Sequence, residues 1–471
     1  MGPGRQYRLS SSTQDVARLR RHAQGMTKRA VVVGGSIGGL LAGLVLAEVC
    51  HEVVLVERGE LVDAPLPRAG VPQGQHAHGL LAGGLAALDE LLPGLCRELE
   101  QSGCPSGDNL RDAAWVLAGR RLARGDSGVR GMTIARPLLE HAIRRRVLAL
   151  PNVSVRAGTR VLGLRRTAGR VTGVRLAPER GVEEQLTAAL VVDASGRYSE
   201  LPAWLIASGL PAPRIEEVAL ETRYASRTYR RLPHHLNGGI ALCLVSSRRV
   251  PRGGIALALD AERWLVSQYA LGGARPPRDH ASFVAFARTL SSPALAELLE
   301  DAEPLSEAHT MRFPSSIRRH YEEMRDFPQG LLVCGDALAS FNPTFGQGIT
   351  VAAKQAVLLR GLCRHVAVQE LGKVFVEQAA PIVDVAWNAA VGPAFAYPGV
   401  AGRLTLKMRL ANAYLPHVIA RAHQDVQVAT ALLRVMQFLA PPASLFAPRL
   451  LFRVLAGMST DAAPAASPAN G

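Results

Sequence analysis

The fold of this chain is decided by the stretch Arg29-Ala-Val-Val-Val-Gly-Gly-Ser-Ile-Gly-Gly-Leu-Leu-Ala-Gly-Leu-Val-Leu-Ala-Glu-Val-Cys-His-Glu-Val-Val-Leu-Val-Glu57-Arg58. It predicts a buried strand, a glycine turn, an apolar helix and a second strand that ends on an acid. A glycine turn lets the backbone approach a pyrophosphate, and the free N–H groups of the following helix bind its charge. The acid accepts hydrogen bonds from an adenosine ribose. The stretch therefore predicts a dinucleotide-binding site.

The glycine pattern departs from the usual G-x-G-x-x-G at one position. Gly34 and Gly39 match it, but Ser36 stands at the middle position, where glycine allows the closest backbone approach. Glu57 follows Gly39 by eighteen residues, close to the spacing of about 20 that the ribose contact expects. The pattern does not distinguish FAD from NAD(P), and a nucleotide-free α/β turn is the alternative. The residues predicted to contact a cofactor here are Gly34, Gly35, Ser36, Ile37, Gly38, Gly39, Glu57 and Arg58.

The composition is that of a globular protein with more than one domain. The chain has 471 residues, enough for about two or three domains. Hydrophobic residues make up 48% and charged residues 20%, and the mean hydropathy is +0.11. The net charge is +15, but the arginines are scattered, without a long basic block. We therefore expect an arginine-rich composition rather than a nucleic-acid partner.

Cysteine usage and the chain ends indicate a cytoplasmic protein. The six cysteines include no C-x-x-C pair and no zinc-ligand spacing, which favours a reducing compartment. No run of about 18 apolar residues predicts a transmembrane helix. Residues 1–28 lack the apolar core of a signal peptide, and residues 461–471 are rich in alanine and proline, so both are predicted to be disordered. Arginine- and leucine-rich helices near the C-terminus leave peripheral membrane contact as an alternative to simple packing.

A loop rich in proline and glycine follows the acid Glu57. Residues 65–79 contain several of both residue types, which excludes a long helix. His76 and His78 lie two residues apart, so both imidazoles can reach one site. A metal centre would need a further ligand at a recognisable spacing, and none is present. We therefore predict no metal, and we expect the two histidines to line a pocket.

A second glycine-rich turn follows a later strand. The run Gly330-Leu-Leu-Val-Cys-Gly335-Asp336 predicts a strand that delivers an aspartate at its carboxyl end. A proline- and glycine-rich loop follows, and a long helix begins near Gly348. Ligands of open α/β sheets bind outside the carboxyl ends of the strands, and a helix N-terminus stabilises an anion there. This segment therefore predicts a second contact region for the same ligand.

Three motifs together resemble those of the class A FAD-dependent monooxygenases of the para-hydroxybenzoate hydroxylase type. They are the turn Gly34–Gly39 with Glu57, the segment Asp193-Ala-Ser-Gly-Arg-Tyr-Ser199, and Gly335-Asp336 with the loop up to Gly348. The resemblance implies that FAD is the cofactor, that Asp336 holds the flavin ribitol, and that the helix at Gly348 faces the N1/O2 edge of the flavin ring. It places near FAD the further residues Arg68, Arg136, Val161, Asp193, Gly335, Pro343, Gly346, Gln347, Gly348 and Ile349.

A closer likeness is to bacterial flavin epoxidases that oxidise polyketide polyenes in polyether biosynthesis. It rests on Arg68-x-Gly-x-Pro-Gln73-x-x-His76-x-His78 and on Asp336-x-x-x-x-Phe-Asn342-Pro-x-x-Gly-x-Gly. The likeness implies an enzyme of antibiotic-type secondary metabolism that epoxidises electron-rich C=C bonds through a flavin C4a-hydroperoxide. Its partners would be O2 and a hydrophobic alkene or aromatic substrate, free or tethered to a carrier protein. The alkene is itself the nucleophile, so no catalytic side chain is obligatory; the predicted pocket residues are Pro72, His76, His78 and Phe345.

The middle motif departs from the family pattern. The family has Asp-Gly before the serine, whereas here Asp193 stands two positions before Ser195. The family aspartate contacts both FAD and NADPH, so the departure leaves two sources of reducing equivalents, NAD(P)H directly or a separate flavin reductase. The alternatives to epoxidation are hydroxylation of a phenol and a non-oxygenating flavin reductase of isoprenoid double bonds. Halogenation is disfavoured because the Trp-x-Trp-x-Ile-Pro signature is missing.

The predicted fold class is α/β. We expect a Rossmann-like FAD-binding domain of the glutathione reductase type, an inserted and mainly antiparallel β substrate domain, and a helical C-terminal region. The FAD-binding domain is predicted to be discontinuous. Its expected parts are 29–79, 130–209 and 326–375, the substrate domain comprises 80–129 and 210–325, and the helical region spans 376–460.

Overall fold

The structure, a computed structural model, describes residues 29–68, 70–397, 400 and 406–458. The predicted disordered ends, 1–28 and 461–471, lie outside the described residues. Within the described residues, none of the helices combines the length and the apolar character that crossing a membrane requires.

A five-stranded parallel sheet forms the centre of the nucleotide-binding half. Its strand order is β20-β12-β1-β2-β8, and the valine- and leucine-rich strands are almost completely buried in the middle. Burial on both faces explains why these strands are continuous apolar runs rather than alternating ones. Their bounds are β1 Arg29–Val33, β2 Glu52–Val56, β8 Val153–Arg156, β12 Leu190–Asp193 and β20 Leu331–Val333.

Helices and a second sheet enclose this parallel sheet. The buried helix α2 (Ile37–Ala47) contacts both α5 (Arg136–Leu148) and α9 (Gly348–Leu362). A three-stranded antiparallel sheet of β9 (Thr159–Thr167), β10 (Arg170–Pro178) and β11 (Glu184–Thr187) joins the same hydrophobic core. The predicted Rossmann-like α/β fold is therefore confirmed.

One predicted strand is wrong. The sequence pattern predicts a single strand over 185–192, but the structure divides it into β11 and β12. β11 pairs antiparallel with β10, whereas β12 pairs parallel with β1 and β20. The residues between them, Ala188 and Ala189, turn the chain from one sheet into the other. Propensity does not detect this turn, because Ala188 and Ala189 carry no glycine or proline turn signal between the two strands.

The second large sheet confirms the expected antiparallel region. Its seven strands are ordered β18-β14-β17-β16-β15-β5-β6, and all neighbours are antiparallel except the pair β15–β5. Helices α7 (His280–Ala287) and α8 (Ala294–Asp301) pack on it around Phe283, Leu295 and Trp264. The strand bounds are β5 Ala113–Leu117, β6 Arg120–Arg121, β14 Thr222–Arg230, β15 Ala241–Leu244, β16 Arg252–Ala258, β17 Arg263–Leu271 and β18 His309–Phe313.

The segment 80–129 divides between the two halves of the molecule. Helices α3 (Ala82–Leu91) and α4 (Leu95–Gln101) pack into the core of the nucleotide-binding half, while β5 and β6 extend the large antiparallel sheet. Small sheets join the halves. They are β3 (Gly79–Leu80), β4 (Ser106–Asp108) and β7 (Arg130–Thr133), and β13 (Arg214–Val218), β19 (Ser316–His320) and β21 (Ala339–Ser340).

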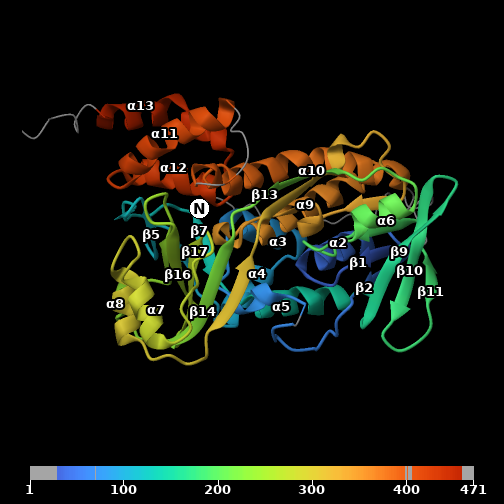
Figure 1. The fold of residues 1–471 in the computed structure, drawn as a ribbon, viewed down its shortest axis with the longest axis horizontal. Helices are drawn as coiled ribbons and strands as arrows, with labels where there is room; N and C mark the ends of the chain where they lie inside the picture. Colours follow the sequence, from blue (N-terminus) through green and yellow to red (C-terminus); the bar gives the residue numbers. More distant parts are fainter. Residues whose placement is uncertain (1–28, 69, 398–399, 401–405, 459–471) are drawn as a thin grey trace, which may run out of the picture.

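The C-terminal region is helical, as predicted. Helix α10 (Val368–Val391) packs on α9 and β20. Helices α11 (Leu406–Ala422), α12 (Val426–Met436) and α13 (Pro448–Met458) form a separate core with residues 110–122. Figure 1 shows these three helices above the large antiparallel sheet, at the end of the molecule opposite β9–β11.

Candidate active site

The glycine turn after β1 requires glycine at two positions. A Cβ on Gly34, whose φ is +109°, would lie 2.4 Å from the carbonyl oxygen of Ala194. A Cβ on Gly39 would lie 1.8 Å from the carbonyl oxygen of Gly34. Gly38 differs, because a Cβ there would meet nothing nearer than the Cα of Gly335 at 3.9 Å. Gly38 and Gly335 therefore face each other across the crevice between the two glycine turns.

The side chain of Ser36, at the middle position of the glycine pattern, forms specific hydrogen bonds. Its Oγ donates to Oε2 of Glu140 at 2.7 Å and accepts a hydrogen bond from Arg136 at 3.2 Å. The serine thus ties the turn before α2 to helix α5. The serine at the middle position of the glycine pattern therefore helps to position the charged side chains of Glu140 and Arg136.

Glu57 lies over the glycine turn, at the end of β2. Its Oε2 accepts the N–H of Gly35 at 2.8 Å, and its Oε1 accepts the N–H of Gly59 at 3.0 Å. Arg68 forms an ion pair with it at 3.4 Å. A carboxylate has about four acceptor positions, so Glu57 is oriented by these contacts and retains capacity for a ribose hydroxyl.

Three arginines and one buried glutamate surround this turn. Arg68 pairs with Glu140 at 2.7 Å, and Arg136 and Arg144 approach the same carboxylate at 4.0 and 3.9 Å. Burial lowers the pKa of Arg136 and of Arg144, against the effect of Glu140. The Nε atoms of Arg68 and Arg136 are buried without a hydrogen-bond partner among the described residues. Unsatisfied buried donors and surplus positive charge suit a diphosphate.

Glu140 is not among the site residues that the sequence predicts. It is 4% exposed and holds the arginine cluster together. A signal was present, since Arg136, Glu140 and Arg144 follow one another at four-residue intervals and must share one face of a helix. That spacing usually indicates a solvated ion-pair ladder, and only the tertiary structure shows that this one is buried.

Asp336 begins the second glycine turn, in the 3-10 turn η5 (Gly335–Ala337) after β20. Its carboxylate has no hydrogen-bond donor among the described residues, and burial raises its pKa although Arg136, Arg197 and Arg319 oppose the rise. An enclosed carboxylate without donors is costly. Hydroxyl groups of a ribitol chain would remove this cost, so the residues present fit FAD.

Asn342 joins the second turn to the large antiparallel sheet. Its Oδ1 accepts hydrogen bonds from the Tyr224 hydroxyl at 2.6 Å and from the Thr344 backbone N–H at 3.1 Å. Its Nδ2 donates to Thr222 on β14 at 2.8 Å. The amide thus fixes the 3-10 turn η6 (Pro343–Phe345), which leads through Gly346 and Gln347 into α9 at Gly348 and Ile349. Pro343 and the N-terminus of α9 are therefore held in a set position relative to β14.

Asp193 has a different environment from the other predicted cofactor residues. It is 1% exposed, and its carboxylate accepts from Ser195 and Ser199. This geometry favours bracing of the loop 194–199 over direct contact with a cofactor. Val161 is buried on β9, and this strand begins beside the backbone of Glu57. The side chain of Arg58 is exposed.

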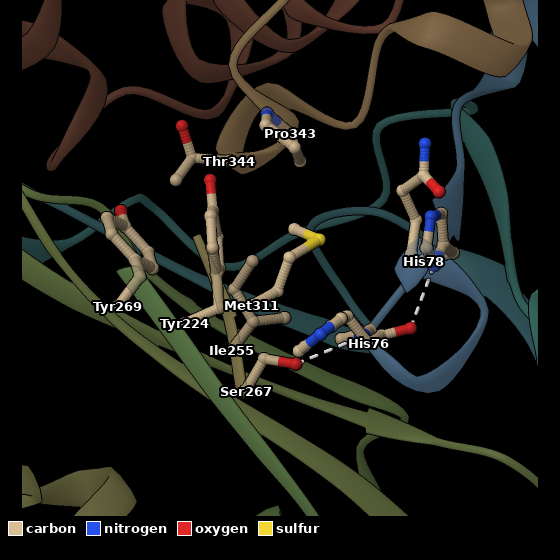
Figure 2. Close-up of a pocket in the computed structure, with 11 residues that line it drawn as sticks. His76, His78, Tyr224, Ile255, Ser267, Tyr269, Met311, Pro343 and Thr344 are labelled. Carbon is tan, nitrogen blue, oxygen red and sulfur yellow. Dashed lines mark hydrogen bonds between the residues drawn. The ribbon is translucent and has the colours of Figure 1, made fainter. Parts of the chain in front are cut away.

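A pocket lies between the loop 72–78, the large sheet and η6. Figure 2 shows Pro343 and Thr344 on one side and the sheet residues Tyr224, Ile255 and Ser267 on the other. His76, His78 and Pro343 of the predicted residues line it; the side chains of Pro72 and Phe345 lie outside the described part of the structure. The full lining is Gln73, His76, Ala77, His78, Tyr224, Ile255, Ser267, Tyr269, Met311, Pro343 and Thr344.

The pocket is uncharged. Its lining contains no aspartate, glutamate, lysine or arginine. Burial lowers the pKa of His76 to about 4, and burial together with Arg136 lowers the pKa of His78 to about 3. Burial raises the pKa of Tyr224 and of Tyr269, so both stay protonated. The site can position a neutral ligand, but it offers no strong base.

Elsewhere in the described part of the chain, one group has the composition of a metal site. His234, His235 and Asp301 place their ligand atoms within 4.8 Å of one another. However, Nδ1 of His235 accepts the indole N–H of Trp264 at 3.0 Å, so the ring proton must be on Nε2, which faces Asp301 at 3.1 Å. A protonated nitrogen cannot ligate a metal. This group is a hydrogen-bond network at the junction of α8 with the sheet.

The comparisons with known proteins agree with this geometry. The model of a family described as "FAD binding domain" matches residues 27–368. Protein Rv3254 of Mycobacterium tuberculosis is 37% identical over 341 residues, which cover 70% of this chain and 72% of that protein. Kynurenine 3-monooxygenase of Salinispora arenicola is 28% identical over 364 residues, covering 70% and 71%. The solved structure of the flavin-dependent brominase Bmp2 has a TM-score of 0.60 at 15% identity, covering 92% of this chain and 98% of the brominase, which shows a common fold.

Proposed function

Because the chain belongs to the FAD-binding-domain family and is a FAD-dependent monooxygenase, we propose that it epoxidises electron-rich C=C bonds of a neutral, polyketide- or polyene-type metabolite. The observation that carries the proposal is the pocket between the loop 72–78 and η6, which has neither a charged side chain nor a strong base. An alkene needs neither, because its own π electrons attack the transferred oxygen.

The chain supplies positioning and the exclusion of water. FAD, when reduced, supplies the activation of O2. Asp336, the arginine cluster and Glu57 would hold the cofactor, and Asn342 fixes the turn η6 against β14. Tyr224, Tyr269, Ile255 and Met311 form the apolar wall that would surround the alkene. A dry, preorganised cavity protects the reactive oxygen from water.

Hydroxylation of an aromatic ring is the second candidate, favoured by the relative named kynurenine 3-monooxygenase. Hydroxylation of a phenol is helped by a base that removes the phenolic proton. His76 and His78 are the only imidazoles of the pocket lining, and burial lowers their pKa values to about 4 and about 3. A base that weak accepts a hydrogen bond but does not take a proton from a phenol of pKa about 10.

The reductant and the compartment belong to the same proposal. No disulfide joins the six cysteines, which supports a reducing cytoplasm. The bracing role of Asp193 favours a separate flavin reductase over direct reduction by NAD(P)H, since this buried carboxylate already accepts three hydrogen bonds from Ser195 and Ser199.

A competition experiment tests the proposal. The FAD-loaded protein, supplied with a flavin reductase and NADH, receives a conjugated polyene alcohol and a phenol of similar size in one vessel. We expect an epoxide of the polyene as the main oxygenated product. Hydroxylated phenol as the main product would establish the second candidate, and consumption of the double bond without oxygen incorporation would establish a reductase.

A further inference from the structure

We propose that His76 and His78 form a fixed pair of opposite hydrogen-bonding polarity, in which His78 offers the bare lone pair of Nε2 and His76 offers an Nε2–H donor, so that the pair recognises an uncharged substrate through a hydroxyl group. This inference rests on the proposed function and narrows its substrate class. A hydroxyl group can donate a hydrogen bond to Nε2 of His78, whereas an ether, a ketone or a carboxylate cannot.

The proton of His78 is fixed by its neighbour in the chain. Nδ1 of His78 lies 2.8 Å from the backbone carbonyl oxygen of His76. A dashed line marks this hydrogen bond in Figure 2. A carbonyl oxygen can only accept, so Nδ1 carries the proton and donates it. In a neutral imidazole the other nitrogen is then an acceptor. Nε2 of His78 has no hydrogen-bond donor among the described residues, although the ring lines the pocket.

The proton of His76 is fixed by a chain of two hydroxyls. Ser267 Oγ accepts the backbone N–H of Ala77 at 2.9 Å, so its own proton must find another acceptor. The acceptor within reach is Oγ of Ser226 at 2.5 Å. Ser226 must then donate to Nδ1 of His76, which lies 2.6 Å away. The opposite order would leave the buried Ser267 hydroxyl without an acceptor, which is unfavourable. Nδ1 of His76 therefore accepts, and Nε2 carries the proton.

The surroundings keep both rings neutral. His76 is 5% exposed, and its ring centroid lies 6.0 Å from that of Tyr224. It also faces His309 of β18, whose positive form would repel a positive charge on His76. His78 faces His76 and the Arg136 guanidinium of α5. No carboxylate among the described residues pairs with either ring in a hydrogen bond or an ion pair. Neutral rings preserve the opposite tautomers over the ordinary pH range.

This arrangement discriminates by charge and by polarity. A carboxylate in the pocket would meet one donor and one lone pair, and an ammonium group would meet no counter-charge. Each would lose its hydration without replacement, which is strongly unfavourable. Opposite tautomers also exclude a metal bridging both Nε2 atoms, because only the nitrogen of His78 has a free lone pair.

The first test reads the tautomers directly. The FAD-loaded protein is labelled with ¹⁵N-histidine, and long-range proton–nitrogen spectra are recorded from pH 5.5 to 8. The resonances are assigned with His76→Asn and His78→Asn, while His51→Asn, an exposed histidine, serves as the control. We expect a neutral Nδ1–H form for His78 and a neutral Nε2–H form for His76 at every pH. The same tautomer in both, or protonation of either ring in this range, would overturn the proposal.

The second test measures the consequence for binding. Farnesol, farnesyl methyl ether and farnesoic acid are titrated into the oxidised, FAD-loaded protein, and the change in flavin absorbance gives the dissociation constants. We expect farnesol to bind about 10-fold more tightly than the ether, a difference that corresponds to one hydrogen bond. His78→Asn keeps a donor for the His76 carbonyl but removes the lone pair, so it should abolish this preference, and His51→Asn should retain it.

The outcomes separate this inference from the proposed function. Equal binding of alcohol and ether, tighter binding of the acid, or binding of none of the three would overturn the hydroxyl-reading role. Because the titration uses oxidised flavin and no turnover, failure to form an epoxide would count against the proposed reaction and leave the binding result standing.

Discussion

The two halves of the candidate active site differ in charge and in their unpaired hydrogen-bonding groups. Around the glycine turn, Arg68, Arg136 and Arg144 surround two carboxylates, Glu57 and Glu140. The Nε atoms of Arg68 and Arg136 are buried there without a hydrogen-bond partner among the described residues. In the pocket beside η6, no charged side chain is present and both histidines are neutral. The first half has unpaired donors that an anion would satisfy, whereas the second half has no charged group that would stabilise an ion. Under the proposed function, the charged half would bind FAD and the uncharged half would bind a neutral substrate.

The largest expected effect comes from Gly39→Ala, because the new Cβ would lie 1.8 Å from the carbonyl oxygen of Gly34. Backbone must move to relieve this contact, so we expect the apoprotein to lose at least about 3 kcal/mol of unfolding free energy and to retain no FAD. Urea unfolding and the ratio of flavin to protein absorbance measure the two effects. The matched control is Gly38→Ala, whose Cβ meets no protein atom nearer than 3.9 Å. It should leave the apoprotein stable and weaken only FAD binding; equal destabilisation by both would contradict this difference.

Asp336→Asn should separate the stability of the apoprotein from cofactor binding. The pKa of the Asp336 carboxyl is raised in the folded chain, so its ionisation destabilises the apoprotein increasingly as the pH rises above its unfolded value of about 4. The variant should therefore raise the Tm of the apoprotein at pH 7, and the increase in Tm should be smaller at pH 4.5. FAD should bind to the variant about 10- to 100-fold more weakly. Undiminished FAD affinity would show that Asp336 does not hold the cofactor.

A smaller effect is expected at the pocket histidine. The pKa of His76 is lowered to about 4, so the unfolded chain binds more protons than the folded one between pH 6.5 and pH 4. The stability of the wild type should fall as the pH falls through this window. The decrease in Tm should be several degrees smaller in His76→Asn than in the wild type. Thermal scans at pH 7 and pH 4.5 measure it, with His51→Asn as the exposed control. A variant that stays as acid-sensitive as the wild type would show that His76 is already charged.

The smallest effect is expected for Ser36→Gly, which restores the usual middle glycine. It removes the hydrogen bond to Glu140 of 2.7 Å, worth about 1.5 kcal/mol for a bond to a charged group. The fold and FAD occupancy should persist, with a slightly faster release of FAD in stopped-flow dilution. Complete loss of FAD would mean that the serine contacts the cofactor itself.

The sequence was sufficient where a local pattern determines the structure. The strand–turn–helix of 29–58, the helix that begins at Gly348 and the antiparallel region from Thr222 to Phe313 are confirmed, because periodicity and glycine placement directly express them. The single strand predicted over 185–192 is wrong, since the departure of β12 toward β1 depends on partners far away in the chain.

The site was predictable only in part, for the same reason. Glycine turns, Asp336 and the pocket histidines belong to local motifs. The roles of Glu140 and Asn342 depend on contacts across 72 or more residues, with Arg68, Ser36 and Tyr224. The tautomers of His76 and His78 require the positions of Ser226 and Ser267, which no spacing in the sequence reveals.

The most direct test of the central claim is a single turnover under ¹⁸O2. The FAD-loaded protein is reduced without oxygen, mixed with a polyene alcohol in ¹⁸O2-saturated buffer, and the products are analysed by mass spectrometry. The uncharged pocket without a base predicts an epoxide that carries one ¹⁸O atom, formed at a rate that does not change between pH 6 and pH 8. Unlabelled product, or a rate that titrates with a base in this range, would contradict it.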